Sequence, residues 1–332
     1  MQTNENSEVI LQVDDLVVEF TTPDGIGRAV DGLSYHITPR ETLGIVGESG
    51  CGKSISALSV LQLVPTPPGH IRRGRVLFDG TDLLTLSDKE IRKVRGQEIS
   101  MIFQEPMTSL NPVLTIGYQI AEVVRRHMGT TKKAAHARAI ELLELVRIPE
   151  PGRRARQFPH QLSGGMRQRA MIAMALSCNP RVLIADEPTT ALDVTIQAQV
   201  LELISDLQKE MGTALILITH DLAVVAETCD RVIVMYAGRK IEEASIGALF
   251  AAPAHPYTRG LLAAVPRLAT SSSTRTLRLN EVPGVVPSIT ALRQGCLFAP
   301  RCKQADDRCR TTPPNFAKVS NAHSVACWHP GE

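Results

Sequence analysis

The stretch Gly47-Glu48-Ser49-Gly50-Cys51-Gly52-Lys53-Ser54 decides the fold of this chain. It follows residues 43–46 (LGIV), which predict a buried strand, and precedes residues 55–63 (ISALSVLQL), which predict the start of a helix. The stretch matches G-x-x-x-x-G-K-[ST], a pattern whose glycines let backbone N–H groups point at phosphate oxygens. We expect Lys53 to reach the β- and γ-phosphates and the Ser54 hydroxyl to bind Mg²⁺. The strand before it and the helix after it favour a phosphate-binding loop over a chance glycine-rich turn.

Length and composition limit the class of protein. The chain has 332 residues, 43% of them apolar and 21% charged, as in a soluble protein with one large and one small domain. Its 36 basic and 34 acidic residues leave a net charge of +2, so no electrostatic footprint of a nucleic-acid-binding protein is present. The first ten residues, MQTNENSEVI, lack the features of a signal peptide, and no window holds eighteen apolar residues. We therefore expect a cytoplasmic protein with reduced thiols.

Polar residues follow three short apolar segments that predict parallel strands. Residues 99–103 (ISMIF) end at Gln104, residues 181–185 (RVLIA) at Asp186-Glu187, and residues 214–219 (ALILIT) at His220. Doubly wound α/β sheets bind ligands at the carboxyl ends of their strands. An Asp in that position is placed to hold Mg²⁺ through water, and the adjacent Glu to orient or deprotonate an attacking water. A further strand, 231–236, is expected to close this core.

Two other segments are expected to flank the core. Residues 9–20 and 28–37 predict an antiparallel sheet. Phe20 lies in the first of these strands; it can offer an aromatic face to adenine and is equally consistent with an ordinary core aromatic. Residues 115–128, 132–147 and 154–160 predict helices that form an insertion between the two halves of the core.

A second glycine-rich loop precedes a long helix that is expected to extend to about residue 177. The loop reads Leu162-Ser163-Gly164-Gly165-Met166 and presents N–H groups and the positive end of a helix dipole. Alone it is weak evidence, because turns use such residues for conformational freedom.

Four of the seven cysteines lie within the last forty residues, as Cys296-x5-Cys302-x6-Cys309-x17-Cys327. In a reducing compartment, clustered cysteines indicate metal binding rather than disulfides. Zinc sites usually contain a Cys-x2–4-Cys knuckle, which is missing here, whereas four thiolates at wider spacing can hold a [4Fe–4S] cluster. The sequence favours the cluster and leaves zinc and unmetallated thiols as alternatives.

Lys53, Gln104, the LSGGM loop, Asp186-Glu187, Asp193 and His220 occur in one characteristic order. In this order the chain resembles the nucleotide-binding subunits of ABC transporters over about residues 8–258. The resemblance implies an α/β fold: an ABC-type P-loop NTPase core with an antiparallel β subdomain and a helical subdomain at about 105–165. It also implies residue roles: adenine stacking by Phe20; the Walker A loop at Gly47–Ser54; Mg²⁺ contacts by Ser54, Gln104 and Asp186; the signature loop at 162–166; the catalytic carboxylate of Glu187; the D-loop at Asp193; and the switch histidine His220.

The same resemblance explains why one chain holds two phosphate-binding loops. In this family two such domains pair head to tail, and each ATP lies between Walker A of one and the signature loop of the other. ATP closes the dimer and hydrolysis reopens it. Met166 departs from the commonest family residue, Gln, but the Ser-Gly-Gly part that touches phosphate is intact.

The tail narrows the resemblance to one group of importers. His255-Pro256-Tyr257, Gln161 and the cysteine-bearing region at 259–332 resemble the ATPase subunits of dipeptide and oligopeptide importers. Some members of that group carry a [4Fe–4S] cluster on such cysteines. The resemblance implies a second, homologous ATPase subunit, two transmembrane permeases, an extracytoplasmic peptide-binding protein, and a peripheral position on the cytoplasmic face of the cell membrane. Related importers for nickel or another small solute share much of this tail.

Two other classes of function make different predictions from the transporter. A soluble ABC ATPase acting on ribosomes or DNA would predict tandem ATPase domains or a long coiled-coil insertion. This chain has one ATPase domain and a short insertion of about sixty residues. A redox- or metal-sensing regulator, in which the tail is the functional element, is compatible with the transporter interpretation and does not exclude it.

Overall fold

The main sheet has eight strands in the order β11-β12-β10-β9-β3-β8-β7-β6. The computed structural model describes residues 9–105, 109–190, 193–264, 283–290 and 294–331. Neighbouring strands from β6 to β9 are parallel, and those from β9 to β11 are antiparallel. The strands are β3 (Thr42–Val46), β6 (Ile99–Ile102), β7 (Val182–Asp186), β8 (Ala214–Thr219), β9 (Arg231–Tyr236), β10 (Arg239–Ser245), β11 (Ala317–Ser320) and β12 (His323–Val325).

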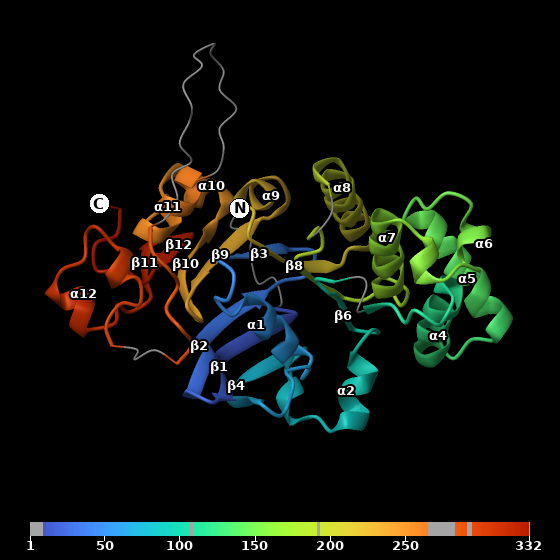
Figure 1. Ribbon diagram of the computed structural model, residues 1–332, viewed down its shortest axis with the longest axis horizontal. Helices are drawn as coiled ribbons and strands as arrows, with labels where there is room; N and C mark the ends of the chain where they lie inside the picture. The colour runs from blue at the N-terminus through green and yellow to red at the C-terminus, as the bar shows by residue number, and fades with distance from the viewer. Residues whose placement is uncertain (1–8, 106–108, 191–192, 265–282, 291–293, 332) are drawn as a thin grey trace, which may run out of the picture.

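A second, antiparallel sheet has the order β2-β1-β4-β5 and lies below the main sheet in Figure 1. Its strands are β1 (Leu11–Thr22), β2 (Gly25–Ile37), β4 (Gly69–Phe78) and β5 (Thr81–Asp82). The two predicted strands at 9–20 and 28–37 are thereby confirmed. Helix α1 (Lys53–Val60) contacts β1, β2 and β7, and one hydrophobic core joins Leu16 of β1 to Ile45 of β3 and Ile216 of β8.

The helical part lies beyond β6, on the right of Figure 1. It contains α4 (Ile116–Met128) and α5 (Lys132–Leu145), which confirm two predicted helices, together with α6 (Pro151–Arg154) and α7 (Gly164–Ala175). The predicted helix at 154–160 is wrong. Pro159 follows an extended Phe158, at φ −87° and ψ 157°, because a residue before proline is forced out of the helical region. Only a short 3₁₀ turn, Pro159–Gln161, forms there.

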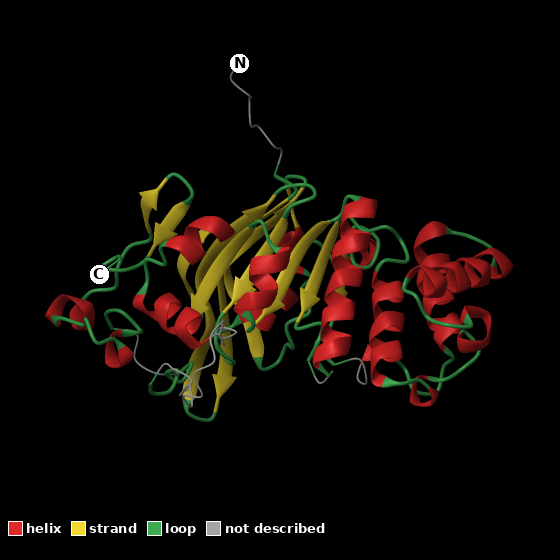
Figure 2. Cartoon of the chain, turned by 90° about the horizontal axis from the view of Figure 1, so that it is seen from above, coloured by secondary structure: helices red, strands yellow, loops and turns green. Residues whose placement is uncertain are grey.

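The remaining helices lie around the two sheets, and Figure 2 shows helices that flank the central strands. They are α2 (Asp88–Val94), α8 (Val194–Met211), α9 (Leu222–Thr228), α10 (Ile246–Ala251), α11 (Pro256–Ala264) and α12 (Asp307–Thr311). Within the described part of the chain, none of the helices is long and apolar enough to cross a membrane.

The predicted strand 231–236 is confirmed as β9, the outermost parallel strand, but the sheet continues past it. Ala237 and Gly238 have φ values of 46° and 84°, and two such residues make a tight hairpin that returns the chain as β10. Strand β12 then pairs with β10, so residues 323–325 extend the same sheet from far along the chain. A third core at this end includes Tyr236, Tyr257 and Phe298.

Candidate nucleotide-binding site

The ends of four parallel strands gather the polar residues that the sequence singled out. Strand β3 ends before Gly47, β6 before Gln104, β7 at Asp186 and β8 before His220. Adjacent pairs in the ladder include Val46 with Thr219 and Asp186 with Ile218, so the strands end at one edge of the sheet. Residues up to 173 positions apart in the sequence (Gly47 and His220) therefore meet there.

Two glycines of the phosphate loop have no substitute in this backbone. Gly47 has φ 155°, and a Cβ atom there would lie 2.3 Å from the carbonyl oxygen of Met235. Gly52 has φ 98°, and its Cβ would lie 2.2 Å from the carbonyl oxygen of Ala29. Gly52 is also the N-cap of α1 and has no side chain to occupy the first N–H groups of the helix. The loop therefore combines close backbone packing with amide groups available for phosphate.

The ammonium group of Lys53 is held inside the loop. Lys53 is only 4% exposed, and its Nζ donates to the carbonyl oxygens of Gly47 (2.7 Å) and Glu48 (3.1 Å). Cys51 is fully buried beside it, and burial raises the pKa of its thiol. Cys51 thus packs beneath the loop, whereas Lys53 places a positive charge inside it.

Ser54 and Asp186 bring two side-chain oxygen groups together at this edge of the sheet. The Ser54 hydroxyl donates to Oδ1 of Asp186 at 2.9 Å, and Asp186 is 4% exposed. Burial raises the pKa of Asp186, while the hydrogen bond from Ser54 lowers it. Magnesium prefers hard oxygen ligands of this kind, so the two residues fit the predicted Mg²⁺ site.

Glu187 is the centre of a polar cluster. Its Oε2 accepts hydrogen bonds from Gln104 Nε2 (3.1 Å) and Thr190 Oγ1 (3.0 Å), and lies 3.6 Å from Nδ1 of His220. The backbone of Glu187 has φ 45°, unusual for a residue with a side chain, and its N–H donates to the carbonyl of Ile218. The sequence did not predict a role for Thr190. Its position three residues after Glu187 is the one feature of the sequence that could have indicated this contact.

The signature loop lies in another part of the molecule. Ser163 is the N-cap of α7 and accepts a hydrogen bond from the N–H of Met166, while Leu162 is buried. Helix α7 contacts α4, α5, α8 and β6, whereas α1 contacts β1, β2 and β7, and the two helices stand apart in Figure 1. The partly buried Met166 packs against the helical core. The structure therefore does not bring residues 163–166 to the phosphate loop of the same chain.

Two further predicted residues have local structural roles. Asp193 is the N-cap of α8, and its Oδ1 accepts from the N–H of Ile196 at 3.0 Å; the preceding residues 191–192 lie outside the described residues. Phe20 is partly buried in β1 and packs on the central core next to Gly69. Stacking of Phe20 on adenine stays a prediction.

The four C-terminal cysteines line one cavity. Cys296, Cys302, Cys309 and Cys327 share its lining with Trp328 and His329. The N–H of His329 donates to Sγ of Cys327 at 3.4 Å. Burial raises the pKa of Cys327 to about 11.

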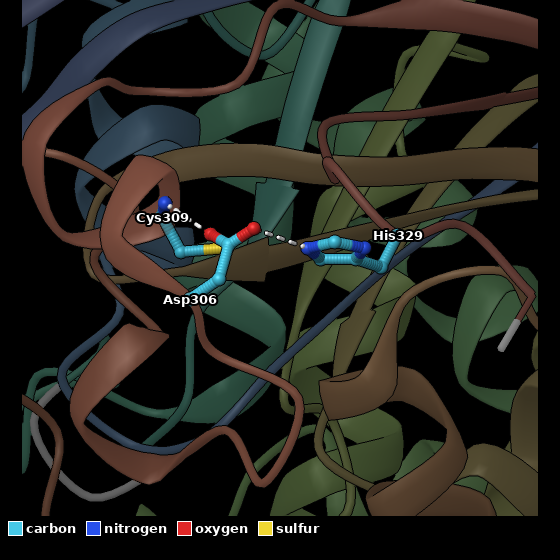
Figure 3. Close-up of side chains that lie close together, drawn as sticks. All are labelled: Asp306, Cys309 and His329. Atoms are coloured by element: carbon cyan, nitrogen blue, oxygen red, sulfur yellow. Dashed lines mark hydrogen bonds and ion pairs between the residues drawn. The ribbon is translucent and has the colours of Figure 1, made fainter.

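A tighter group of possible ligands lies beside this cavity (Figure 3). One carboxylate oxygen of Asp306 accepts from the N–H of Cys309 at 2.8 Å and so caps α12; the other lies 3.0 Å from Nε2 of His329. The hydrogen bonds from Cys309 hold the pKa of Asp306 at about 2. Asp306, Cys309 and His329 are the group of His, Cys, Asp or Glu residues, within the described part of the chain, whose ligand atoms all lie within 4.8 Å of one another. No three of the cysteine sulfurs described there lie that close together.

The His255-Pro256-Tyr257 element connects the tail to the phosphate loop. The carboxylate of the fully buried Glu242 accepts hydrogen bonds from the N–H groups of Ala254 and His255. Burial lowers the pKa of His255 to about 3, and its neutral Nδ1 accepts from the N–H of Tyr257. The Tyr257 hydroxyl in turn accepts from the N–H of Glu48 at 2.9 Å. The sequence marked this element but not its contact with the loop.

Comparisons with known proteins agree with this architecture. The family profile described as "ABC transporter" matches residues 30–190, and that described as "Oligopeptide/dipeptide transporter, C-terminal region" matches residues 241–309. The chain resembles the solved ATP-binding cassette MJ0796, a dimer bound to ADP and phosphate, with a TM-score of 0.64 and 28% identity, over 71% of this chain and 98% of that one. It also resembles cbiO1 of Clostridium perfringens, with a TM-score of 0.61 and 30% identity, over 73% and 91% of the two chains.

Curated relatives match over nearly the whole length. A probable peptide ABC transporter ATP-binding protein of Sinorhizobium fredii is 54% identical over 100% of this chain and 98% of that protein. The oligopeptide transport ATP-binding protein OppD of Bacillus subtilis is 52% identical over 97% and 89%. The dipeptide transport ATP-binding protein DppD of Escherichia coli is 49% identical over 97% and 97%. The chain therefore belongs to the family of ABC transporter ATPases that form the ATP-binding subunits of dipeptide and oligopeptide importers.

Proposed function

We propose that this chain is the ATP-hydrolysing motor subunit of an importer for dipeptides or oligopeptides. The observation that carries the proposal is the cluster in which Glu187 contacts Gln104, Thr190 and His220 at the sheet edge next to the phosphate loop. Lys53 would neutralise phosphate charge, Ser54 and Asp186 would hold Mg²⁺ together with Gln104, and Glu187 would orient and deprotonate the attacking water. His220 would contact the γ-phosphate.

The second half of each ATP site would come from another subunit. Because α7 and α1 lie in different parts of the molecule, we propose that residues 162–166 and Asp193 complete the ATP site of a homologous partner. A heterodimer of ATPases, two transmembrane permeases and an extracytoplasmic peptide-binding protein would form the assembly, with this chain peripheral on the cytoplasmic face of the membrane. Residues 8–258 would form the ATPase domain and 259–332 the importer-specific region.

The peptide substrate is favoured over the alternatives by the tail and by the relatives. The profile that matches residues 241–309 carries the oligopeptide and dipeptide description, and the two relatives OppD and DppD are named for the same substrates. An importer for nickel or another small solute would use the same motor, and uptake assays with both solutes distinguish the two.

The test of the motor is Glu187→Gln in the assembled transporter. We expect ATP binding and dimer closure to persist while hydrolysis falls by roughly 10²-fold or more, since a positioned base contributes that much. The control is Glu227→Gln, an exposed carboxylate on α9, which should hydrolyse ATP at the normal rate. A Glu187→Gln protein with normal hydrolysis would refute the assigned role.

We also propose that Cys296, Cys302, Cys309 and Cys327 hold a [4Fe–4S] cluster. Three features support it: all four line one cavity, a backbone N–H points at the Cys327 sulfur, and the sulfurs are more widely spaced than one zinc ion requires. Four thiolates at about 2.3 Å from a tetrahedral zinc would lie roughly 3.8 Å apart. Such a cluster would hold together the segments that carry the four cysteines, including α12.

Iron and acid-labile sulfide, measured on anaerobically purified protein, test the cluster. We expect Cys302→Ser and Cys309→Ser to lose most of both, and Cys178→Ser, which lies outside the cavity, to retain them. Stoichiometric zinc without sulfide in the parent protein would establish the zinc alternative. Peptide uptake by the same variants shows whether the site is needed for transport.

A further inference from the structure

The side chain of Arg301 reaches from the cysteine-bearing region to the phosphate loop. Its Nη1 lies 2.9 Å from Oε2 of Glu48 and its Nη2 lies 3.0 Å from Oε1. Two parallel hydrogen bonds of this kind, between a planar guanidinium and a carboxylate, form the strongest and most directional type of ion pair. The Arg301 side chain is 5% exposed and that of Glu48 is 28% exposed, so solvent screens the pair only weakly.

The guanidinium of Arg301 is also held by its own surroundings. Its Nε donates to the carbonyl oxygen of Pro283 at 2.8 Å. The rings of Tyr236 and Phe298 lie 5.7 Å and 5.8 Å from the guanidinium carbon, within range of cation–π attraction. Because these contacts fix the orientation of Arg301, the residue can in turn fix the position of Glu48.

Glu48 is connected on three sides. Its carboxylate is bound by Arg301, its N–H donates to the Tyr257 hydroxyl, and its carbonyl oxygen accepts from Lys53 Nζ. The first contact comes from the C-terminal region, the second from the His255-Pro256-Tyr257 element just before it, and the third from the residue expected to bind the β- and γ-phosphates. Glu48 therefore links the C-terminal region directly to the lysine of the phosphate loop.

A carboxylate in this position needs a partner if the loop is to bind ATP. Glu48 is the second residue of the loop, and a negative charge there repels the phosphates. If Arg301 were absent, this negative charge would remain uncompensated in the same loop that holds the ammonium of Lys53. We propose that Arg301 is a positioning residue for nucleotide binding, which acts by holding and neutralising Glu48 of the phosphate loop.

The position of Arg301 makes this contact depend on the cysteine-bearing region. Arg301 is the last residue of the 3₁₀ helix Ala299–Arg301, which lies between Cys296 and Cys302. The N–H of Ala299 donates to the carbonyl of Cys296, and that of Cys302 to the carbonyl of Ala299. One small turn thus carries both the guanidinium and two of the cysteines, so its folding affects ATP affinity.

The test is Arg301→Gln in the full transporter, with kcat and KM for ATP measured separately. We expect KM to rise roughly tenfold, a typical coupling between neighbouring sites, with kcat nearly unchanged at saturation. The loss of affinity should be larger for ATP than for ADP and absent for adenosine, because it depends on phosphate charge. Arg301→Lys keeps the positive charge but loses the two parallel hydrogen bonds of the guanidinium. Its KM for ATP should lie between those of the parent protein and of Arg301→Gln.

The double variant Glu48→Gln/Arg301→Gln gives the decisive comparison. Because it removes the repelling carboxylate as well, it should restore KM to near the parent value, whereas Arg301→Gln alone does not. The control is Arg231→Gln, which breaks the ion pairs of Arg231 with Glu41 and Glu243 away from the loop and should leave KM unchanged. A lowered kcat with normal KM in Arg301→Gln, or a double variant no better than the single one, would overturn the inference.

The inference rests on the proposed ATP-binding role of residues 47–54 and is independent of the metal at the cysteines. If the parent protein fails to bind ATP, the proposed role of residues 47–54 is refuted. If the parent binds ATP and Arg301→Gln binds it equally tightly, only the inference about Arg301 is refuted. Iron is measured on the same samples. Suppose that Arg301→Gln and Glu48→Gln/Arg301→Gln both lose iron, but only the double variant recovers the parent KM. The change in KM is then caused by the loss of the ion pair and not by the loss of iron.

Discussion

At the scale of single residues, the phosphate loop shows how much a motif match contains. The requirement for glycine at positions 47 and 52 is visible in the backbone, where a Cβ would meet a carbonyl oxygen at 2.3 Å or 2.2 Å. The motif leaves position 48 unspecified, and in this chain the carboxylate of Glu48 pairs with Arg301. A pattern of this kind therefore predicts the residues that shape the backbone, whereas the residues at its variable positions depend on the surrounding fold.

Gly52→Ala tests the close contact at the start of α1. We expect a loss of roughly 2–3 kcal/mol in stability or a displaced loop with at least tenfold weaker ATP binding, because φ is positive and Ala29 O is too close. Thermal unfolding and ATP titration measure the two effects. The matched control is Gly129→Ala, with φ 62° and open space around it, which should cost only about 1 kcal/mol and leave ATP binding intact. Normal ATP binding and stability in Gly52→Ala would contradict this reasoning.

At the scale of elements, local patterns predicted most helices and strands correctly. The helix at 116–128 has a strong apolar periodicity, and the strands of the parallel core are short, continuous apolar runs that are buried along their whole length. The failures have local causes: Pro159 prevents the helix predicted at 154–160, and the turn at Ala237-Gly238 adds β10 to the sheet. Strand β12, with only three residues, is too short for any periodicity to show.

The pairing of β12 with β10 includes one buried polar contact. Nε2 of His323 lies 2.6 Å from Oε1 of the fully buried Glu242, which also holds the backbone of Ala254 and His255. His323→Ala removes one partner of a buried carboxylate, so we expect a loss of about 3 kcal/mol. Thermal unfolding should show a Tm lower by at least about 3 °C.

Lys318→Ala, on the exposed neighbouring strand β11, is the control for this effect. It should change stability by no more than about 0.5 kcal/mol, as exposed substitutions usually do. Equal Tm values for His323→Ala and Lys318→Ala would show that Glu242 needs no partner on β12.

At the scale of the whole molecule, the loop at 47–54, the glycine-rich loop at 162–166 and the cysteine cavity lie in different parts of one architecture. The parallel strands bring Gln104, Asp186-Glu187 and His220 to the edge where residues 47–54 lie. The signature loop belongs to the helical part beyond β6, and the cysteines belong to the opposite end, next to β10 (Figure 1). We therefore propose that a partner chain completes the ATP sites. The phosphate loop contacts the C-terminal region through Arg301.

The sequence by itself determined the family, the catalytic and phosphate-binding residues that we propose, and the grouping of the cysteines. These depend on local chemistry: glycines permit one loop conformation, and polar residues follow apolar strands. Only the tertiary structure decided that Arg301 meets Glu48, 253 positions away, that Tyr257 binds the same residue, and that Thr190 joins Glu187. Such pairs leave no periodic signal in the chain, because the packing of distant elements, and not the sequence around either partner, brings the charges together.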